Sequence, residues 1–404
     1  MSSGKGAERG GAAKHQASGA RAEWPVRRLG KLCVLVSGRH IEAKDYNTES
    51  RGVGYLTGPA DFGELNPVVS KWTEHPQALA QGGDILITVK GAGVGKINLL
   101  DADNVAISRQ LMAVRVKDAD RRFVYAFLAW QFEYFQSRAN GATVPGISRE
   151  DVLGLRVPVP ALAEQRRIVG ILDEAFAGIA TAKANAEKNL QNARELFESH
   201  LQAVFTQRGD GWVDRKVGDI AKKSLGKMLD KAKNQGTLRP YLRNLNVRWF
   251  DFDLSDLSQM RFLDEEAEKY TAVKGDVLIC EGGYPGRAAI WDKEYPIHFQ
   301  KAIHRVRFHQ AEHNRWFVYY LSAKDASGEL RRHFTGTGIQ HFTGETLGRF
   351  EVPIPPLQQL RRLVSQFDKV AVETQRLASL YQRKLAALDE LKKSLLHQAF
   401  TGQL

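Results

Sequence analysis

A strongly basic stretch lies between Lys216 and Arg248. It contains nine Lys and Arg residues but only two acidic residues, and it includes Tyr241 and is followed by Trp249. Lysine and arginine attract phosphate groups, and aromatic side chains can contact bases. This run is therefore the strongest candidate for binding a polyanion, and a solvated surface without a ligand is the alternative. The candidate contacts in it are Lys222, Lys223, Lys227, Lys231, Lys233 and Arg243.

Two glycine-rich segments each follow a predicted strand and end in a cation. They are Lys90-Gly-Ala-Gly-Val-Gly-Lys96 and Glu281-Gly-Gly-Tyr-Pro-Gly-Arg287. Glycine lets the backbone approach a phosphate closely, and a terminal cation would add charge there. The candidate contacts are Lys90, Lys96, Tyr284 and Arg287. A hairpin turn with exposed charges is the alternative interpretation.

A second loop also occurs twice, as Gly141-Ala-Thr-Val-Pro-Gly-Ile147 and as Gly336-Thr-Gly-Ile-Gln-His-Phe342. Hydroxyl, amide and imidazole groups can hydrogen-bond to bases or phosphates, so Thr143, Gln340 and His341 are candidate contacts. A structural turn before the last strand of each domain would explain the same residues.

Catalytic motifs are incomplete in this chain. The segment from Lys90 to Lys96 is not a P-loop, because Ile97 occupies the position of the Ser or Thr that would hold magnesium. His309-Gln-Ala-Glu-His313 matches a zinc-protease pattern, but it directly follows the predicted strand Ile303–Phe308 instead of lying on one helix. We therefore expect no catalytic residue and no metal site.

Composition limits the class of protein. The chain has 404 residues, 58 Lys and Arg against 46 Asp and Glu, and a formal charge of +12, which is frequent in proteins that bind polyanions. No apolar run approaches the length of a membrane span, and the first residues lack the apolar core of a secretory signal. With only two cysteines a disulfide scaffold is excluded, so we expect a cytoplasmic protein. Residues 1–23, rich in Gly, Ala and Ser, are expected to be a flexible tail.

An internal repeat organises the rest of the chain. Six short segments recur in order, at an offset that rises from 188 to 195 residues, which indicates duplication of a whole unit. Examples are Trp24–Gly30 with Trp212–Gly218, Gly83–Thr88 with Gly275–Cys280, and Val157–Pro160 with Val352–Pro355.

Each unit has a globular part and a long helix. The globular parts, residues 24–160 and 209–355, contain predicted strands at Asp84–Val89 and Asp276–Cys280. Each also contains a short helix, near Phe123–Phe135 or Trp316–Ala323. Mixed strands and short helices favour an α/β or α+β fold.

Proline-free segments at 161–206 and 357–401 predict the long helices. Apolar residues follow alternating steps of three and four in the second segment, and a similar, alanine-rich stripe runs along the first. We therefore expect the helices to pair with each other as an antiparallel coiled coil, giving a duplicated molecule with pseudo-twofold symmetry. Packing of each helix on its own globular domain is the alternative. The expected seam of the second helix is Leu360, Leu363, Phe367, Val370, Leu377, Tyr381, Leu388, Leu391 and Leu395.

The ends of both units resemble a known family. Pro158-Val-Pro-Ala-Leu-Ala-Glu-Gln-Arg-Arg-Ile-Val-Gly-Ile-Leu-Asp173, Pro353-Ile-Pro-Pro-Leu-Gln-Gln-Leu-Arg-Arg-Leu363 and the closing Leu-Leu-His-Gln-Ala-Phe-Thr-Gly402 resemble specificity subunits of type I restriction–modification systems. The resemblance covers Trp24 to Leu404. Leu360 departs from the pattern, because it replaces the usual Gln.

The resemblance implies a non-catalytic subunit that reads double-stranded DNA. Residues 24–160 and 209–355 would be target-recognition domains, and the helices would be spacers. The partners would be two methyltransferase subunits and, in the full complex, two restriction subunits, with no membrane involved. S-adenosylmethionine, ATP and Mg²⁺ would bind those partners, and this chain would bind no cofactor. Diverged domains would read a bipartite, asymmetric target.

Two other classes of function remain open from the residues alone. A duplicated metal-dependent DNA nuclease would need paired carboxylates with a nearby lysine, but Gly283 stands where that lysine would follow Asp276 and Glu281. A coiled-coil scaffold without a DNA role would explain the helices, and the basic stretch would then be a solvated surface.

Overall fold

We describe a computed structural model of the chain, covering residues 24–101, 104–139, 141, 144–230 and 232–404. The expected tail at 1–23, Thr143 and Lys231 lie outside the described residues. The chain divides into two compact units. Unit 1 comprises the chain up to Ala184 together with Leu385–Leu404, and unit 2 comprises Asn185–Lys384. Each long helix therefore contributes to both units.

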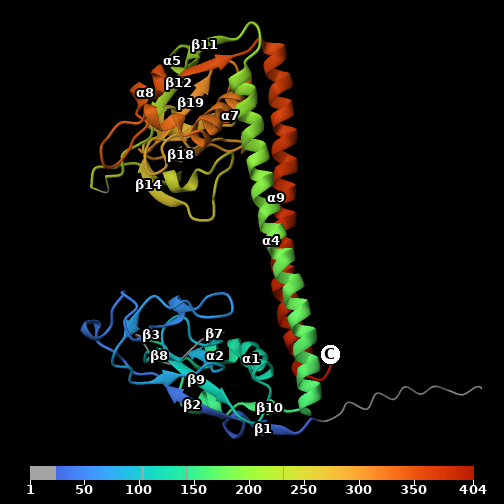
Figure 1. Cartoon of the computed structure of the whole chain (residues 1–404). Coiled ribbons are helices and arrows are strands. Elements are labelled where there is room, and N and C mark those ends of the chain that lie inside the picture. The colour runs from blue at the N-terminus through green and yellow to red at the C-terminus, as the bar shows by residue number, and fades with distance from the viewer. Residues whose placement is uncertain (1–23, 102–103, 140, 142–143, 231) are drawn as a thin grey trace, which may run out of the picture. The chain divides into compact units, whose positions relative to one another are not determined.

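Unit 1 contains two four-stranded sheets and a two-stranded ribbon (Figure 1). The first sheet is antiparallel and has the order β2 (Cys33–Ser37), β9 (Leu111–Val116), β6 (Ile85–Thr88), β7 (Ile97–Leu99). The second has the order β4 (Trp72–Thr73), β3 (Val53–Leu56), β8 (Val105–Ile107), β5 (Leu79–Ala80), with β3 and β8 parallel. The ribbon pairs β1 (Val26–Arg28) with β10 (Arg156–Pro158).

Unit 2 repeats this topology strand for strand. Its first sheet is β12 (Ala221–Leu225), β19 (Ile303–Phe308), β16 (Val277–Cys280), β17 (Ala288–Ile290). Its second is β14 (Ser258–Phe262), β13 (Thr237–Leu242), β18 (Ile297–Phe299), β15 (Thr271–Ala272), with β13 and β18 parallel. The ribbon pairs β11 (Val213–Lys216) with β20 (Glu351–Ile354). The duplication inferred from the sequence is confirmed.

One buried ion pair recurs in the first sheet of each unit. Arg115 on β9 donates two hydrogen bonds to Asp84, at 3.0 and 2.9 Å. Arg307 on β19 donates two to Asp276, both at 2.7 Å. Each carboxylate also accepts a backbone N–H, from Gln81 or Val273. Because both carboxylates are almost fully buried, these contacts fix the start of the strand that leads to each glycine-rich loop.

The short helices differ somewhat from their predicted ranges. The helix expected near Phe123–Phe135 is two helices, α1 (Arg121–Trp130) and α2 (Phe132–Arg138), with a break at Gln131. Its counterpart is one longer helix, α7 (Glu312–Ala326). The remaining short helices are α3 (Arg149–Leu153), α5 (Val217–Ile220), α6 (Ala267–Tyr270) and α8 (Gly344–Arg349).

The two long helices are α4 (Leu162–Gln207) and α9 (Leu357–Phe400). Within unit 1 they lie side by side and antiparallel, because Arg167 reaches the carbonyl of Leu404 at 2.8 Å whereas Lys183 pairs with Asp389. Most seam residues are buried or half-buried, but Leu391 is wrong as a seam position, since it is 47% exposed. Leu396 and Ala399 are buried in its place. In the residues that the structure describes, no helix is long and apolar enough to cross a membrane.

The Gln-to-Leu departure at position 360 has a local structural explanation. In unit 1 the buried Gln165 side chain accepts a hydrogen bond from the Asp120 N–H and donates one to the Pro160 carbonyl, both at 2.8 Å. In unit 2 the corresponding Leu360 is buried in the apolar core. An apolar contact thus replaces two hydrogen bonds at the start of the long helix.

Candidate nucleic-acid interface

The two loops singled out from the sequence meet in unit 1. Lys90 forms an isolated β-bridge with Gly146. The Gly91 N–H donates to the Pro145 carbonyl at 2.8 Å, and the Ile147 N–H donates to the Val89 carbonyl at 3.0 Å. The glycine-rich loop and the second loop therefore form one surface.

The same two loops meet in unit 2. Gly282 forms the corresponding β-bridge with His341, and the Phe342 N–H donates to the Glu281 carbonyl at 2.7 Å. Nε2 of His304 on β19 lies 2.9 Å from the Phe342 carbonyl, so the proton must lie on Nε2. Burial lowers the pKa of His304, which favours the neutral ring at this contact.

The glycine-rich loops are turns that only glycine can make without strain. Gly95 and Gly286 both have a φ of +84°. A Cβ on Gly95 would lie 2.9 Å from Cβ of Phe135, and one on Gly286 would lie 2.4 Å from Cδ2 of Leu330. Gly95 and Gly286 therefore hold the two loops in the same defined turn conformation.

An exposed aliphatic side chain lies at the tip of the second loop in both units. Val144 is 58% exposed and Ile339 is 72% exposed. In each turn a glycine precedes it at positive φ, Gly141 at +134° and Gly336 at +106°. A solvent-facing β-branched residue at the same point of two related turns is suited to contacting an apolar group of a ligand.

Sequence reasoning missed one cation in each unit. Arg109 lies in the turn between β8 and β9, and the exposed Lys301 lies in the corresponding turn between β18 and β19. The turn joins the glycine-rich loop directly, because the Val89 N–H donates to the Gln110 carbonyl and the Glu281 N–H donates to the Ala302 carbonyl, both at 2.8 Å. In the sequence, Arg109 and Lys301 are distinguished only as cations two residues after a strand. Such a pattern is too common in proteins to identify a binding residue.

In unit 1 these elements surround a hollow of about 630 Å³. Lys90, Arg109, Gln110 and Ser148 line it, so two cations and two hydrogen-bonding side chains converge there. Lys96 lies elsewhere: it lines a separate hollow with Trp130 and with Lys393 of α9. Lys90 and Lys96, although they belong to one loop, therefore line different hollows.

Unit 2 presents a different set of side chains. Gln340 is exposed and His341 is half-buried on the second loop. Tyr284 is 58% exposed, and the guanidinium of Arg287 lies 3.9 Å from the centroid of its ring. Arg287 also donates to the carbonyl of Asn244, so this cation faces the protein.

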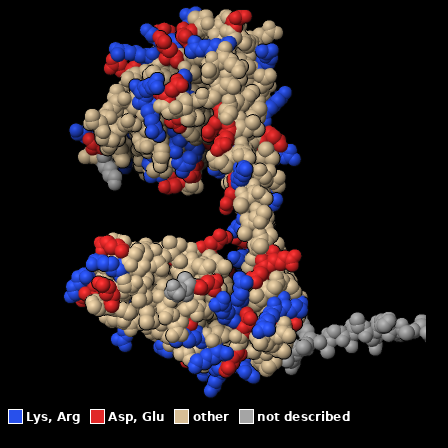
Figure 2. All heavy atoms as spheres, viewed as in Figure 1, with Lys and Arg blue, Asp and Glu red and all other residues tan. Residues whose placement is uncertain are grey.

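Many cations of the basic stretch Lys216–Arg248 are paired with carboxylates, so fewer of them are free to bind a polyanion than the composition suggested. Lys227 is only 8% exposed; its ammonium pairs with Glu266 and donates to the Arg261 carbonyl at 3.1 Å. Figure 2 shows basic and acidic side chains interspersed over the visible face of unit 2. Other pairs in the stretch are Lys233–Asp230, Arg239–Asp264, Arg243–Asp256 and Arg248–Asp253. The candidate contact Lys227 therefore presents no exposed charge, because Glu266, which is distant in sequence, pairs with it.

Lys222 and Lys223 fit the expectation better. Both are exposed on β12, an edge strand of the first sheet of unit 2. Among the described residues neither lies within 4 Å of a carboxylate oxygen in an ion pair. They remain the candidates for phosphate contacts from this stretch.

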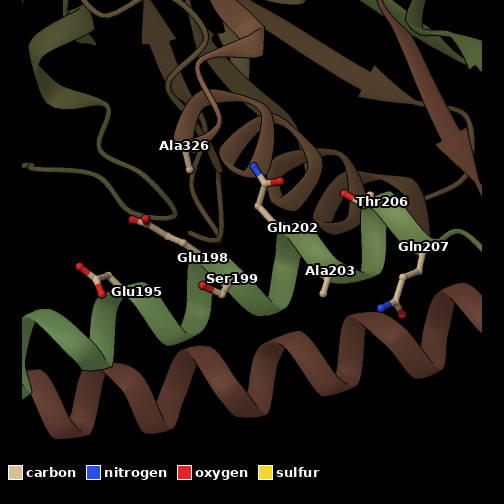
Figure 3. Close-up of a pocket in the computed structure, with 8 residues that line it drawn as sticks. All are labelled: Glu195, Glu198, Ser199, Gln202, Ala203, Thr206, Gln207 and Ala326. Carbon is tan, nitrogen blue, oxygen red and sulfur yellow. The ribbon is translucent and has the colours of Figure 1, made fainter.

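A further hollow of about 600 Å³ lies on the last turns of α4 (Figure 3). Gln202 points from α4 toward the end of α7 and donates to the Ala323 carbonyl at 3.2 Å. Glu195 and Glu198 line the same hollow.

Over the described part of the chain, no group of three His, Cys, Asp or Glu side chains is arranged to hold a metal ion. His309 precedes α7 and His313 lies within it, as the rejection of the zinc-protease pattern required.

Comparison with protein families finds one match that covers most of the chain. The model of the type I restriction modification DNA specificity domain matches residues 21–191 and again residues 209–382. The two matches correspond to the two copies of the repeat.

Curated relatives agree with that match. The MjaVIII specificity subunit of Methanocaldococcus jannaschii is 18% identical over 95% of this chain and 93% of its own length. The putative MjaX specificity subunit of the same organism is 28% identical over 44% of this chain, an alignment that spans 42% of that relative's length. The EcoKI specificity subunit of Escherichia coli K12 is 21% identical over 66% of this chain and 62% of its own.

Solved structures share the fold. A chain from a study of complex assembly and conformational transition of the type I R-M system has a TM-score of 0.78 at 19% identity, covering 95% of this chain and 99% of that one. The HsdS subunit of Thermoanaerobacter tengcongensis has a TM-score of 0.59 at 18% identity, covering 95% and 98%. Two repeated sheet-and-helix domains with two long helices are thus a known architecture.

Proposed function

Because this chain belongs to the type I restriction modification DNA specificity family, we propose that it reads a bipartite, asymmetric DNA sequence for a methyltransferase and restriction complex. Each unit would read one half-site of double-stranded DNA. The observation that carries the proposal is the meeting of the same two loops in both units, beside the cation-bearing turn that holds Arg109 or Lys301.

The charges and shapes at these loops are suited to DNA. Lysine and arginine supply phosphate affinity that falls with salt, whereas side chains that reach base edges supply specificity. In unit 1 the interface would use Lys90, Arg109 and Gln110; in unit 2 it would use Lys301, Tyr284 and Gln340. Lys222 and Lys223 would add phosphate contacts to unit 2.

The asymmetry of the target follows from the difference between the loops. The β-bridge to the second loop is made by Lys90 in unit 1 and by Gly282 in unit 2, and the loop of unit 1 has no aromatic residue comparable to Tyr284. Two surfaces with different side chains on the same backbone would recognise different bases. The half-sites should therefore be dissimilar, with unread base pairs between them.

The long helices would serve as spacer and docking surface. Segments 161–206 and 357–401 would set the separation of the half-sites and bind two methyltransferase subunits and, in the full complex, two restriction subunits. S-adenosylmethionine, ATP and Mg²⁺ would bind on those partners. In this proposal the chain is a cytoplasmic, non-catalytic subunit.

Binding experiments distinguish this proposal from its alternatives. The full-length chain, with its methyltransferase subunits, should bind duplex DNA with an affinity that falls steeply as salt rises. Absence of salt dependence, or equal affinity for an uncharged competitor, would favour a scaffold without a DNA role. Metal-dependent cleavage of DNA by the purified chain alone would favour a nuclease.

A further inference from the structure

The ring of Tyr284 is exposed on one face and supported on the other. The side chain is 58% exposed at the tip of the glycine-rich loop of unit 2. The guanidinium of Arg287 lies over one face of the ring, 3.9 Å from its centroid. A cation at this distance is attracted to the face of an aromatic ring and restricts its movement. The opposite face is therefore the one available to a ligand.

Arg287 is itself held by the protein. Its Nη2 donates to the Asn244 carbonyl at 3.1 Å, and its Nε is buried without a hydrogen-bond partner among the described residues. Asn244 is tied back to the same loop, because its side-chain amide donates to the Gly282 carbonyl at 3.0 Å. An Nε that solvent does not reach is poorly placed to contact a phosphate. The position of Arg287 therefore points to support of the ring.

The backbone of the loop leaves the ring little freedom. Gly283 has a φ of +77°, and a Cβ there would lie 2.1 Å from the side-chain nitrogen of Asn244. The Gly286 N–H donates to the Cys280 carbonyl at 2.9 Å, which closes the turn at its other end. Tyr284 thus projects from a turn that is fixed on both sides.

Unit 1 has no such ring. The corresponding loop, Lys90–Lys96, contains no aromatic residue, and it ends in Lys96 where the loop of unit 2 ends in Arg287. Among the groups that bases display in the major groove, the 5-methyl group of thymine is the apolar one. An aromatic face without hydrogen-bonding atoms is complementary to that group.

We propose that Tyr284 determines specificity by placing its open ring face against a thymine 5-methyl group in the half-site of unit 2, and that Arg287 is the positioning residue for this ring. The inference rests on the proposed DNA-reading function. It adds a chemical group that unit 2 recognises and assigns Arg287 a role other than phosphate binding.

Replacement of thymine by deoxyuridine tests the contact, because it removes the methyl group alone. Once the target is mapped from methylated sites, each thymine of the half-site is replaced in turn, and binding by the full-length chain in its methyltransferase complex is measured. At one position the wild-type affinity should fall about fourfold, the factor expected for burial of one methyl group. The same replacements in the half-site of unit 1 serve as the internal comparison.

Variants then assign the effect to the ring. Tyr284→Ala should abolish the difference between thymine and deoxyuridine at that position, whereas Tyr284→Phe should keep it, since the hydroxyl is not required. Tyr295→Ala is the matched control, because Tyr295 is 53% exposed in the same unit but packs on Trp291. It should leave the difference unchanged.

Salt dependence separates positioning from phosphate binding at Arg287. Arg287→Gln should reduce the thymine preference while the slope of log affinity against log salt stays unchanged. A slope smaller by about 0.9 would identify a phosphate contact and overturn the positioning role. A half-site of unit 2 without an A·T pair, or a methyl effect that persists in Tyr284→Ala, would overturn the contact itself. If the wild-type complex shows no sequence-specific binding, the proposed function fails instead.

Discussion

Phe205, near the end of α4, packs edge-to-face against Trp316 of α7, with ring centroids 4.8 Å apart. Its repeat counterpart, Phe400 at the end of α9, packs in the same way against Phe123 of α1 at 5.1 Å. Helix α4 begins at the end of the first globular domain but closes the core of unit 2, and α9 begins at the end of the second but closes the core of unit 1. Each globular domain is thus completed by the helix that follows the other one.

Phe400→Ala should therefore destabilise unit 1, although position 400 follows the second globular domain in the sequence. Truncation of a buried phenylalanine costs about 3–5 kcal/mol, from the lost transfer free energy and the cavity left behind. Hydrogen exchange of peptides from each unit measures the effect separately. Phe205→Ala should destabilise unit 2, and Leu196→Ala, at a 61% exposed position of α4, should change little. If Phe400→Ala instead reduced hydrogen-exchange protection in unit 2, the assignment of the end of α9 to the core of unit 1 would be contradicted.

The repeat carried most of what the sequence could predict about the fold. It placed the matching strands at Asp84–Val89 and Asp276–Cys280, and the proline-free segments with apolar residues at steps of three and four located both long helices, because hydrophobic periodicity is a local signal. The meeting of Lys90 with Gly146 was not predictable, since 56 residues separate them and only the sheet register joins them. For the same reason Arg109 was missed, and the pairing of Lys227 with Glu266 was not foreseen. Charge in a sequence window does not reveal which cations a distant carboxylate binds.

Neutralising Lys222 and Lys223 should weaken DNA binding without weakening the fold. Both are exposed on β12, so Gln at both positions removes the charge of at most two phosphate-binding groups. The slope of log affinity against log salt should then fall by up to about 1.8, because each phosphate that a lysine neutralises adds about 0.9 to that slope.

Lys227→Gln is the matched control from the same stretch. Because Lys227 is buried against Glu266 and over the ring of Phe262, its loss should lower the free energy of unfolding of unit 2 and leave the salt slope unchanged. A salt slope that responds to Lys227 but not to Lys222 and Lys223 would contradict this assignment.

Acid should destabilise unit 2 through His304. Burial, with a smaller contribution from Lys223, holds the pKa of His304 below its usual value of 6.5, although Glu281 and the Phe342 carbonyl act in the opposite direction. Below about pH 6.5 the His304 side chain binds a proton in the unfolded chain but not yet in the folded chain. The contribution of the neutral His304 ring to the free energy of unfolding is therefore present at pH 7.5 and is lost as the pH falls through the folded pKa. Burial lowers the pKa of His298, His313 and His333 as well.

Denaturant unfolding of the full-length chain at pH 7.5 and pH 5 measures this dependence. His304→Gln retains a donor for the Phe342 carbonyl but does not titrate in this range, so the variant should lose less stability between the two pH values. An equal loss in the variant and the wild type would exclude His304 as a source of the pH dependence.

The spacer role of the helices predicts a change in target geometry. Four residues inserted after Ala184 in α4 and four after Lys384 in α9, where the two units divide, should lengthen each helix by about 6 Å. At about 3.4 Å for each base pair, the half-sites should move apart by about one to two base pairs. Mapping of methylated sites gives the new separation, and an unchanged separation would show that the helices do not set it.

Mapping of methylated bases in the host genome, with the gene present and with it deleted, tests the central claim most directly. If the two units read two half-sites through their paired loops, deletion should remove one motif, made of two dissimilar halves at a fixed separation, and the wild-type gene should restore it. A bipartite motif that survives the deletion, or a lost motif that is continuous or has identical halves, would contradict the account.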